Sequence, residues 1–347
     1  MRSRVAFNAL ALRPGGSGVQ TYIRELLGQL VDLLDCTLIA AVQDDAVSEL
    51  PSRITPVVRE QADGVRRAIA GLRDLGGADL VHGLDVDLPR RRRCPMVATI
   101  HDMAVFDVPW AFPKIRALGE QRLTAASVRR ADAIIVMSNF TAERINDRFG
   151  RTAQVIPLAP RTDVVAPTER AVHMARATYG LAERFVLHVG NIEPRKDVAS
   201  LAAACRQAEV PLVLAGARVG SAAVPAGGRA IGYVPTEQLS GLYGAATLVC
   251  YPSLYEGFGL PPVEAMACGA PVVATRIPAL TEVLGDGAEL VPPGDVAALA
   301  RTLRDLFDNE ERRKALGAAG QRRVSLLSWT ATATATTDVY RSLGLTT

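Results

Sequence analysis

Short apolar runs alternate with longer, helix-like segments from one end of the chain to the other. Runs that are apolar at nearly every position are typical of strands buried on both faces of a parallel sheet. In the first half, we expect strands at residues 5–12, 37–42, 79–82, 96–100, 133–137 and 154–156. In the second half, we expect strands at residues 185–190, 212–215, 247–251, 271–274 and 289–291.

The segments between these runs place apolar residues three or four positions apart, which makes one face of a helix apolar. Examples are Tyr22, Leu26, Leu27 and Leu30, and later Val296, Leu299, Leu303 and Leu306. This alternation of strand and helix predicts an α/β protein with doubly wound parallel sheets.

A proline-rich stretch interrupts the alternation at mid-chain, where Pro157, Pro160 and Pro167 suit a linker better than a helix or a strand. A chain of 347 residues is also long for a single domain. We therefore expect two α/β domains and a terminal helix that packs back on the first domain. Their expected bounds are residues 1–165, 166–328 and 329–347.

Composition narrows the environment and the partners of this chain. A formal net charge of +3 is too small to indicate a nucleic acid as partner. The apolar runs are shorter than the roughly 18 residues that a membrane-spanning helix needs. The five cysteines are odd in number and widely spaced, which is typical of free thiols in a reducing compartment. We expect a cytoplasmic protein.

Basic residues gather in one part of the first half. Arg90 to Arg93 form a run, and Lys114, Arg116, Arg122, Arg129 and Arg130 follow. The pattern favours a solvated face. The alternative is a surface that meets anionic lipid or a phosphate-bearing acceptor, which would give weak peripheral contact at the inner face of a membrane.

Two loops that follow expected strands could bind phosphate. Residues 14–19 include Gly15 and Gly16 and precede a helix, where backbone N–H groups favour an anion. Their spacing is not that of a dinucleotide-binding fingerprint. In the second loop, residues 189–197, Arg195 and Lys196 are adjacent cations that would hold a diphosphate well.

The most specific signal is the segment of residues 251–272. Glu256 ends a loop whose glycines, Gly257 and Gly259, let the backbone approach a ligand, and Glu264 lies eight residues further on. Two carboxylates near one site can accept hydrogen bonds from several sugar hydroxyls, and such charge-assisted bonds are the strong ones. The segment therefore indicates a sugar-binding site.

At these residues the chain resembles glycosyltransferase family 4, whose members have the GT-B fold, with two Rossmann-like doubly wound domains facing across a cleft. The resemblance covers nearly the whole chain. It is most specific at the pair Glu256 and Glu264. It implies an enzyme that transfers a sugar from a nucleotide-diphosphate donor with retention of configuration.

The resemblance also implies roles for individual residues. Glu256 would contact hydroxyls of the donor sugar, Glu264 would hold the ribose, and Lys196 would neutralise the diphosphate. Further contacts fall on backbone or side-chain groups of Gly15, Gly16, His101, Gly190, Gly232, Tyr233, Val234, Gly257, Phe258, Gly259 and Leu260. Of these, His101 matches the family's sugar-contacting histidine, and residues 232–234 match the segment that reads the base.

The chain departs from many relatives at one position. They carry an arginine directly after the glycine of the second motif, where this chain has Asn191. Arg195 is the nearest substitute, and we expect it to bind phosphate beside Lys196. The acidic pair Asp85 and Asp87 resembles a metal-binding motif of the other major glycosyltransferase fold, but it lies away from the donor motifs. We expect no metal and no other cofactor.

The sequence leaves the substrates open. The resemblance to mannosyltransferase-like members makes GDP-mannose the first choice of donor, with UDP- and dTDP-sugars as alternatives, and a bacterial glycan, lipid-linked or natural-product hydroxyl as acceptor. One alternative function is a nucleotide-sugar epimerase or hydrolase on the same fold. Another is a non-catalytic partner that binds a nucleotide sugar. The retained residues Glu256, Glu264 and Lys196 favour the transferase.

Overall fold

The computed structural model describes residues 3–16, 18–220 and 223–346. The chain forms two compact units. The first comprises Met1–Leu158 with Ser328–Thr347, and the second comprises Ala159–Leu327. The boundary expected after residue 165 therefore lies earlier, between Leu158 and Ala159.

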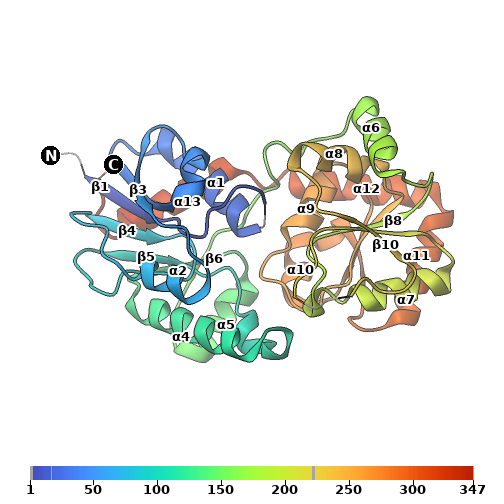
Figure 1. The fold of residues 1–347 in the computed structure, drawn as a ribbon. Coiled ribbons are helices and arrows are strands. Elements are labelled where there is room, and N and C mark those ends of the chain that lie inside the picture. Colours follow the sequence, from blue (N-terminus) through green and yellow to red (C-terminus); the bar gives the residue numbers. More distant parts are fainter. Residues whose placement is uncertain (1–2, 17, 221–222, 347) are drawn as a thin grey trace. The chain divides into compact units, whose positions relative to one another are not determined.

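A seven-stranded parallel sheet forms the centre of the first unit (Figure 1). Its strands are β1 (Arg4–Asn8), β2 (Thr37–Gln43), β3 (Ile54–Arg59), β4 (Leu80–Gly83), β5 (Met96–Thr99), β6 (Ala133–Val136) and β7 (Gln154–Val155). They are ordered β3-β2-β1-β4-β5-β6-β7. Val5 and Ala6 of β1 point to opposite faces of the sheet and are both fully buried, as expected for a central strand covered on both faces.

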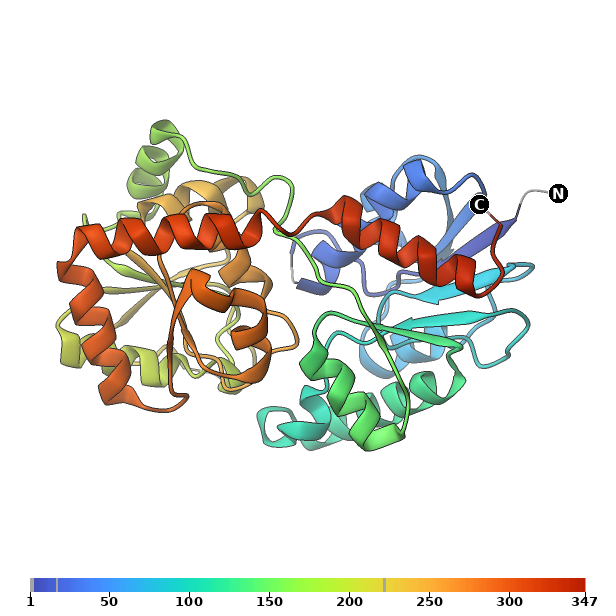
Figure 2. The ribbon, with the colours of Figure 1, turned by 180° about the vertical axis from the view of Figure 1, so that it is seen from behind.

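Helices cover this sheet. They are α1 (Gly18–Leu33), η1 (Asp44–Glu49), α2 (Gly64–Gly71), α3 (Ala104–Asp107), η2 (Pro109–Ala111), α4 (Lys114–Arg130), α5 (Asn139–Phe149) and α13 (Trp329–Ser342). The last of these is the C-terminal helix, drawn in red in Figure 2, and it packs on α1. Trp329 at its start is buried, with its ring centroid 6.5 Å from that of Tyr22.

The second unit repeats the same architecture with a six-stranded parallel sheet, ordered β10-β9-β8-β11-β12-β13 (Figure 1). Its strands are β8 (Val186–Val189), β9 (Leu212–Ala215), β10 (Gly228–Gly232), β11 (Leu248–Tyr251), β12 (Val272–Thr275) and β13 (Ala288–Val291). Its helices are α6 (Glu169–Tyr179), η3 (Pro194–Lys196), α7 (Val198–Ala208), α8 (Thr236–Ala245), α9 (Leu260–Ala267), α10 (Pro278–Leu284), η4 (Gly285–Gly287), α11 (Val296–Asp308) and α12 (Glu310–Val324). The predicted doubly wound α/β class is confirmed.

The mid-chain stretch forms neither helix nor strand between β7 and α6, as its prolines predict, but it is packed against the protein. Leu158, Ala159 and Val164 are buried. The backbone of Val165 accepts a hydrogen bond from the Cys268 thiol and donates one to the Ser240 hydroxyl. Prolines exclude regular structure but not packing, so this segment is irregular, and from Ala159 onward it is part of the second unit.

No described helix is long and apolar enough to cross a membrane. All five cysteines are free thiols, and four of them are buried.

Candidate functional site

The site predicted from residues 189–197 and 251–264 lies at the switch point of the second sheet. In this sheet β8 has β9 and β10 on one side and β11 to β13 on the other. The loops that leave β8 and β11 therefore diverge at their carboxyl ends. Crevices at such switch points are the usual ligand sites of open α/β sheets.

Hydrogen bonds and ion pairs join these two loops. The backbone N–H of Leu254 donates to the carbonyl of Arg195 at 2.8 Å. The guanidinium of Arg195 donates to the carbonyl of Tyr255 at 3.2 Å. Lys196 Nζ lies 2.5 Å from Glu256 Oε1, and Arg195 Nη1 lies 3.2 Å from Glu256 Oε2. The three predicted residues Arg195, Lys196 and Glu256 thus form one cluster.

The cluster is electrostatically strong because it is mostly shielded from water. The side chains of Lys196 and Glu256 are 13% and 11% exposed. Burial alone would raise the pKa of Glu256, but Lys196 and Arg195 overcome it and lower this pKa to about 2. Burial and the neighbouring Arg195 lower the pKa of Lys196. Glu256 is therefore a carboxylate at every physiological pH.

A second carboxylate balances the cluster. Glu193 Oε1 lies 2.9 Å from Arg195 Nε, and the Glu193 side chain is 16% exposed. The two cations Arg195 and Lys196 are thus matched by the two anions Glu193 and Glu256. The charges of these four residues sum to zero.

Glu264 has a different set of partners. Its carboxylate lies 2.7 Å from Arg161 Nε and 3.4 Å from Arg161 Nη2, and it accepts a hydrogen bond from the Tyr243 hydroxyl at 3.3 Å. Arg161 also donates to the Thr236 hydroxyl at 3.0 Å. The side chain of Glu264 is 1% exposed, and burial raises its pKa although Arg161 and Tyr243 favour the ionised form. The structure does not bring Glu264 into contact with the Glu256 cluster, and its ribose role stays a prediction.

The loop after β11 ends at the N-terminus of α9. Gly259 caps this helix with φ 95°, and an added Cβ would lie 2.5 Å from Leu280, so only glycine fits there. Leu260 and Phe258 are buried beside it. Gly257 lies between Glu256 and this turn. Pro261 and Pro262 have no backbone N–H and the N–H of Val263 bonds to the carbonyl of Gly259, so within the first turn of α9 only Leu260 offers a backbone N–H to an anion.

The remaining predicted residues of this unit lie at other strand ends. Gly190 follows β8 with φ 148°, and Gly232 ends β10 with φ 79°. After Gly232, Tyr233 is half exposed and Val234 is buried. Asn191 is exposed and adjacent to Gly190.

His188 is a residue that the sequence did not single out. It is fully buried on β8, and its Nδ1–H donates to the carbonyl of Cys250 at 3.0 Å. Burial lowers its pKa to about 4, so the ring is neutral and Nε2 is an acceptor. Nε2 has no hydrogen-bond partner among the described residues, and it lies 3.4 Å from the position of a Cβ at Gly190. A lone histidine in a strand gives no sequence signal of this placement.

In the first unit, the predicted residues lie at the corresponding edge of the sheet. The switch point here lies between β1 and β4. Gly15 and Gly16 are exposed in the loop after β1, and Gly15 has φ 87°. His101 follows β5, where its Nε2–H donates to the carbonyl of Leu84 at 2.9 Å. Its ring lies nearly perpendicular to that of Tyr22, at 83°, with a centroid distance of 5.0 Å.

A buried chain of polar side chains joins α13 to the strands β4 and β5. Tyr340 of α13 bonds to His82 Nδ1 at 2.6 Å, and His82 Nε2 bonds to the Thr99 hydroxyl at 2.8 Å. Thr99 in turn bonds to the hydroxyl of Tyr22 at 2.9 Å. Burial lowers the pKa of His82 to about 3, so this chain is neutral. It ties the C-terminal helix to β4 and to β5, the strand that precedes His101.

The acidic pair Asp85 and Asp87 forms ion pairs with Arg67. Arg67 Nη1 lies 3.2 Å from Asp85 Oδ2 and 3.3 Å from Asp87 Oδ2. Burial raises the pKa of Asp87 to about 7, against the opposing effect of Arg67. Among the described residues no group of three or more histidine, cysteine, aspartate or glutamate side chains could hold a metal ion.

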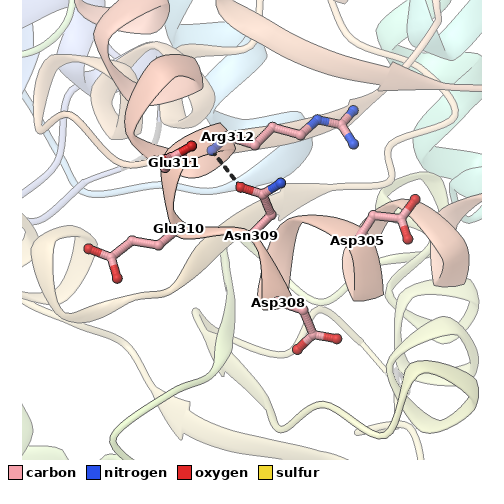
Figure 3. A pocket seen from close by; sticks show the side chains of 6 residues that line it. All are labelled: Asp305, Asp308, Asn309, Glu310, Glu311 and Arg312. Carbon is pink, nitrogen blue, oxygen red and sulfur yellow. Dashed lines mark hydrogen bonds between the residues drawn. The ribbon is translucent and has the colours of Figure 1, made fainter.

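A hollow of about 540 Å³ lies elsewhere in the second unit, at the turn between α11 and α12 (Figure 3). It is lined by Asp305, Asp308, Asn309, Glu310, Glu311 and Arg312. Asn309 caps α12 by accepting a hydrogen bond from the backbone of Arg312 at 2.9 Å. These exposed polar residues are typical of a helix–helix turn, and none of the predicted site residues belongs to them.

Comparison with known proteins agrees with this geometry. Residues 16–163 match the profile described as "Glycosyltransferase Family 4", and residues 175–323 match that described as "Glycosyl transferases group 1". The chain is 33% identical to O-antigen chain mannosyltransferase B of Escherichia coli over 298 residues, which covers 80% of this chain and 78% of the relative.

A second relative and a solved structure extend the match. The chain is 32% identical to the MMP α-(1→4)-mannosyltransferase of Mycolicibacterium hassiacum over 302 residues, covering 79% and 72% of the two chains. The fold matches sucrose-phosphate synthase of Thermosynechococcus elongatus with a TM-score of 0.80, 24% identity and 99% of each chain covered. This chain therefore belongs to glycosyltransferase family 4 and is a glycosyltransferase with the GT-B fold.

Proposed function

We propose that this enzyme moves a hexosyl group from a nucleoside-diphosphate sugar to a hydroxyl of a glycan, lipid-linked or natural-product acceptor. GDP-mannose is the proposed donor, and the names of the two mannosyltransferase relatives support a mannosyl group. The observation that carries the proposal is the cluster of Lys196, Arg195 and Glu256 at the switch point of the second sheet.

In the proposed reaction, Lys196 and Arg195 stabilise the negative charge that grows on the departing diphosphate. Preorganised charges of this kind are usually the largest single contribution to catalysis. Glu256 accepts hydrogen bonds from hydroxyls of the donor sugar. The proposed contacts of the first unit come from Gly15, Gly16 and His101.

We propose retention of configuration by front-side attack. The bond between the anomeric carbon and the phosphate oxygen breaks, and the acceptor oxygen bonds to the same face. The acceptor proton passes to the departing phosphate oxygen. A double displacement through Glu256 is less favoured, because both oxygens of this carboxylate are engaged by cations. Leaving-group stabilisation is assigned to Lys196 and Arg195 rather than to a metal ion.

Thermal unfolding with a panel of GDP-, UDP-, dTDP- and ADP-sugars, with and without EDTA, tests this proposal. We expect one nucleotide class to raise the midpoint regardless of EDTA, and Lys196→Met to abolish this shift. Lys314→Met is the matched control, because Lys314 is an exposed lysine on α12. Loss of the shift with EDTA would overturn the metal-independent site.

Product analysis separates the proposed transferase from its alternatives. Consumption of the donor without an acceptor would indicate an epimerase or a hydrolase. Binding without turnover in the presence of a broad acceptor panel would indicate a non-catalytic partner. Transfer of the sugar to an acceptor hydroxyl is the result that we expect.

We also propose weak peripheral contact with an anionic membrane, through a surface that differs from the expected arginine run. Arg92 and Arg93 pair with Asp132 and Asp74. The exposed apolar side chains Trp110, Ile115 and Leu118 instead lie on η2 and the first turns of α4. The exposed basic residues Lys114, Arg122 and Arg129 lie on the same helix. Apolar and basic groups together are typical of surfaces that bind membrane interfaces.

Co-sedimentation with phosphatidylglycerol vesicles tests this contact. Ile115→Glu should reduce binding, whereas Leu326→Glu should not, because Leu326 is an exposed apolar residue of the second unit, outside the proposed surface. Absence of binding by the unmodified chain would refute the proposed contact.

A further inference from the structure

The Glu256 cluster carries no surplus positive charge, although it is the proposed diphosphate site. Arg195 and Lys196 supply two positive charges, and Glu193 and Glu256 supply two negative charges within 3.2 Å of them. A site selected only for tight binding of diphosphate would leave its cations unmatched. Binding of diphosphate therefore does not account for the two carboxylates beside the cations.

The two carboxylates differ in what else they can reach. Within the described part of the chain, the ion pair of Glu193 is with Nε of Arg195. Glu256 contacts both cations and lies in the loop that precedes the N-terminus of α9. Under the proposed function, Glu256 also accepts hydrogen bonds from the donor sugar. It can thus gain new partners from the sugar, whereas the diphosphate can only repel it.

Transfer of the sugar changes the charge that this cluster faces. A nucleoside-diphosphate sugar carries about two negative charges, and the released nucleoside diphosphate carries about three at neutral pH, because its terminal phosphate has a second pKa near 6. After transfer the sugar hydroxyls have also left Glu256. The spent nucleotide therefore meets the same carboxylate with more negative charge and without the compensating hydrogen bonds.

We propose that Glu256 makes the site discriminate the sugar-bearing donor from the spent nucleoside diphosphate, and so promotes release of that product. The inference rests on the proposed function of the same site. It makes Glu256 a specificity-determining residue whose charge weakens the binding of one ligand and whose hydrogen bonds strengthen the binding of the other. Charges about 6 Å apart at a partly buried site are strong enough for a tenfold or larger effect on affinity.

Calorimetric titration of GDP and GDP-mannose into the unmodified enzyme and two variants tests the inference, with UDP and UDP-glucose as a second pair. Glu256→Gln should bind the nucleoside diphosphate about tenfold more tightly, and the sugar nucleotide no more tightly than the unmodified enzyme does. The ratio of the two Kd values should fall by about tenfold. Glu193→Gln is the matched control: it removes one negative charge of the same cluster but no proposed sugar contact, so it should lower the ratio of the two Kd values less than Glu256→Gln does.

The outcomes separate this inference from the proposed function. If no nucleotide binds the unmodified enzyme, both the proposed function and the inference that rests on it are wrong. If nucleotides bind but Glu256→Gln leaves the ratio of Kd values within twofold, the inference alone fails. Glu256→Asp keeps the charge and serves if the glutamine variant does not fold. It should retain weak binding of the nucleoside diphosphate, and tighter binding would overturn the inference.

Discussion

Glu256 and Glu264 are eight residues apart in one motif, yet the fold gives them opposite surroundings. Glu256 lies in a loop, partly open to solvent, with two cations from the neighbouring loop. Glu264 lies within α9, closed to solvent, and its cation comes from the mid-chain segment. The first carboxylate is the one to which we assign a ligand contact. In this structure the second ties residues 159–165 to the second unit.

The largest loss of stability should come from removing the ion pair between Arg161 and Glu264. Arg161→Ala leaves a buried carboxylate without its cation, which typically costs about 3–5 kcal/mol of unfolding free energy. Urea unfolding measures this loss. Arg304→Ala removes an exposed partner of Glu209 and should cost at most about 1 kcal/mol.

A double variant sharpens this first prediction. Replacing both Arg161 and Glu264 by leucine removes the buried charges together, and it should recover much of the lost stability. Equal instability of the single and double variants would mean that the polar contacts of Arg161 to Thr236, rather than the ion pair, hold the segment.

The acid dependence of stability should distinguish Glu256. Its folded pKa of about 2 lies below the ordinary value of 4.5, so its ionised form stabilises the fold above pH 4.5. That contribution is lost as the pH falls from 4.5 towards 2, and the shift corresponds to about 3 kcal/mol. The stability difference between the unmodified enzyme and Glu256→Gln should shrink over this range in urea unfolding experiments. A difference that stays constant from pH 7 to pH 3 would contradict the assigned ion pairs.

Loss of a cation from the Glu256 cluster should reduce the catalytic rate. Lys196→Met removes the cation nearest to Glu256 and should lower kcat about 100-fold, because a preorganised charge no longer stabilises the leaving diphosphate. Steady-state kinetics with the donor identified by thermal unfolding measures this change. An unchanged kcat with a raised KM would assign Lys196 to ground-state binding alone.

The smallest effect should come from the third hydrogen bond to Glu264. Tyr243→Phe removes the hydroxyl that donates to Glu264 at 3.3 Å and leaves Arg161 in place. We expect a loss of about 1 kcal/mol in urea unfolding, which is typical of one such bond. A loss as large as that of Arg161→Ala would show that the hydroxyl, not the guanidinium, is the main partner of Glu264.

The sequence predicted the central strands better than the edge strands. The strands β3 and β10 were missed, and both lie at an edge of a sheet. Pro56 lies within β3, and β10 begins and ends with a glycine. Neither segment therefore has the continuous apolar run of a buried strand. An edge strand is less covered by helices and pairs with one neighbouring strand only. Its residues therefore need not form the continuous apolar run by which buried strands are recognised.

The candidate site was partly predictable for a related reason. Loops that follow parallel strands must lie at one edge of the sheet, so residues 190–196 and 252–259 could be placed together from sequence. Which charge pairs with which could not be predicted. Arg161 comes from a segment about a hundred residues before Glu264 and carries no local signal of this contact.

The sequence by itself determined the α/β class, the central strands, the family, and the residues that gather at the switch point of the second sheet. These follow from periodicity and from the order of strands and loops, which are local properties of the chain. Only the tertiary structure decided that Glu256 is held by two cations in a neutral cluster and that Glu264 is sealed by Arg161. Burial and ion pairing depend on segments distant in sequence that meet only when the chain folds.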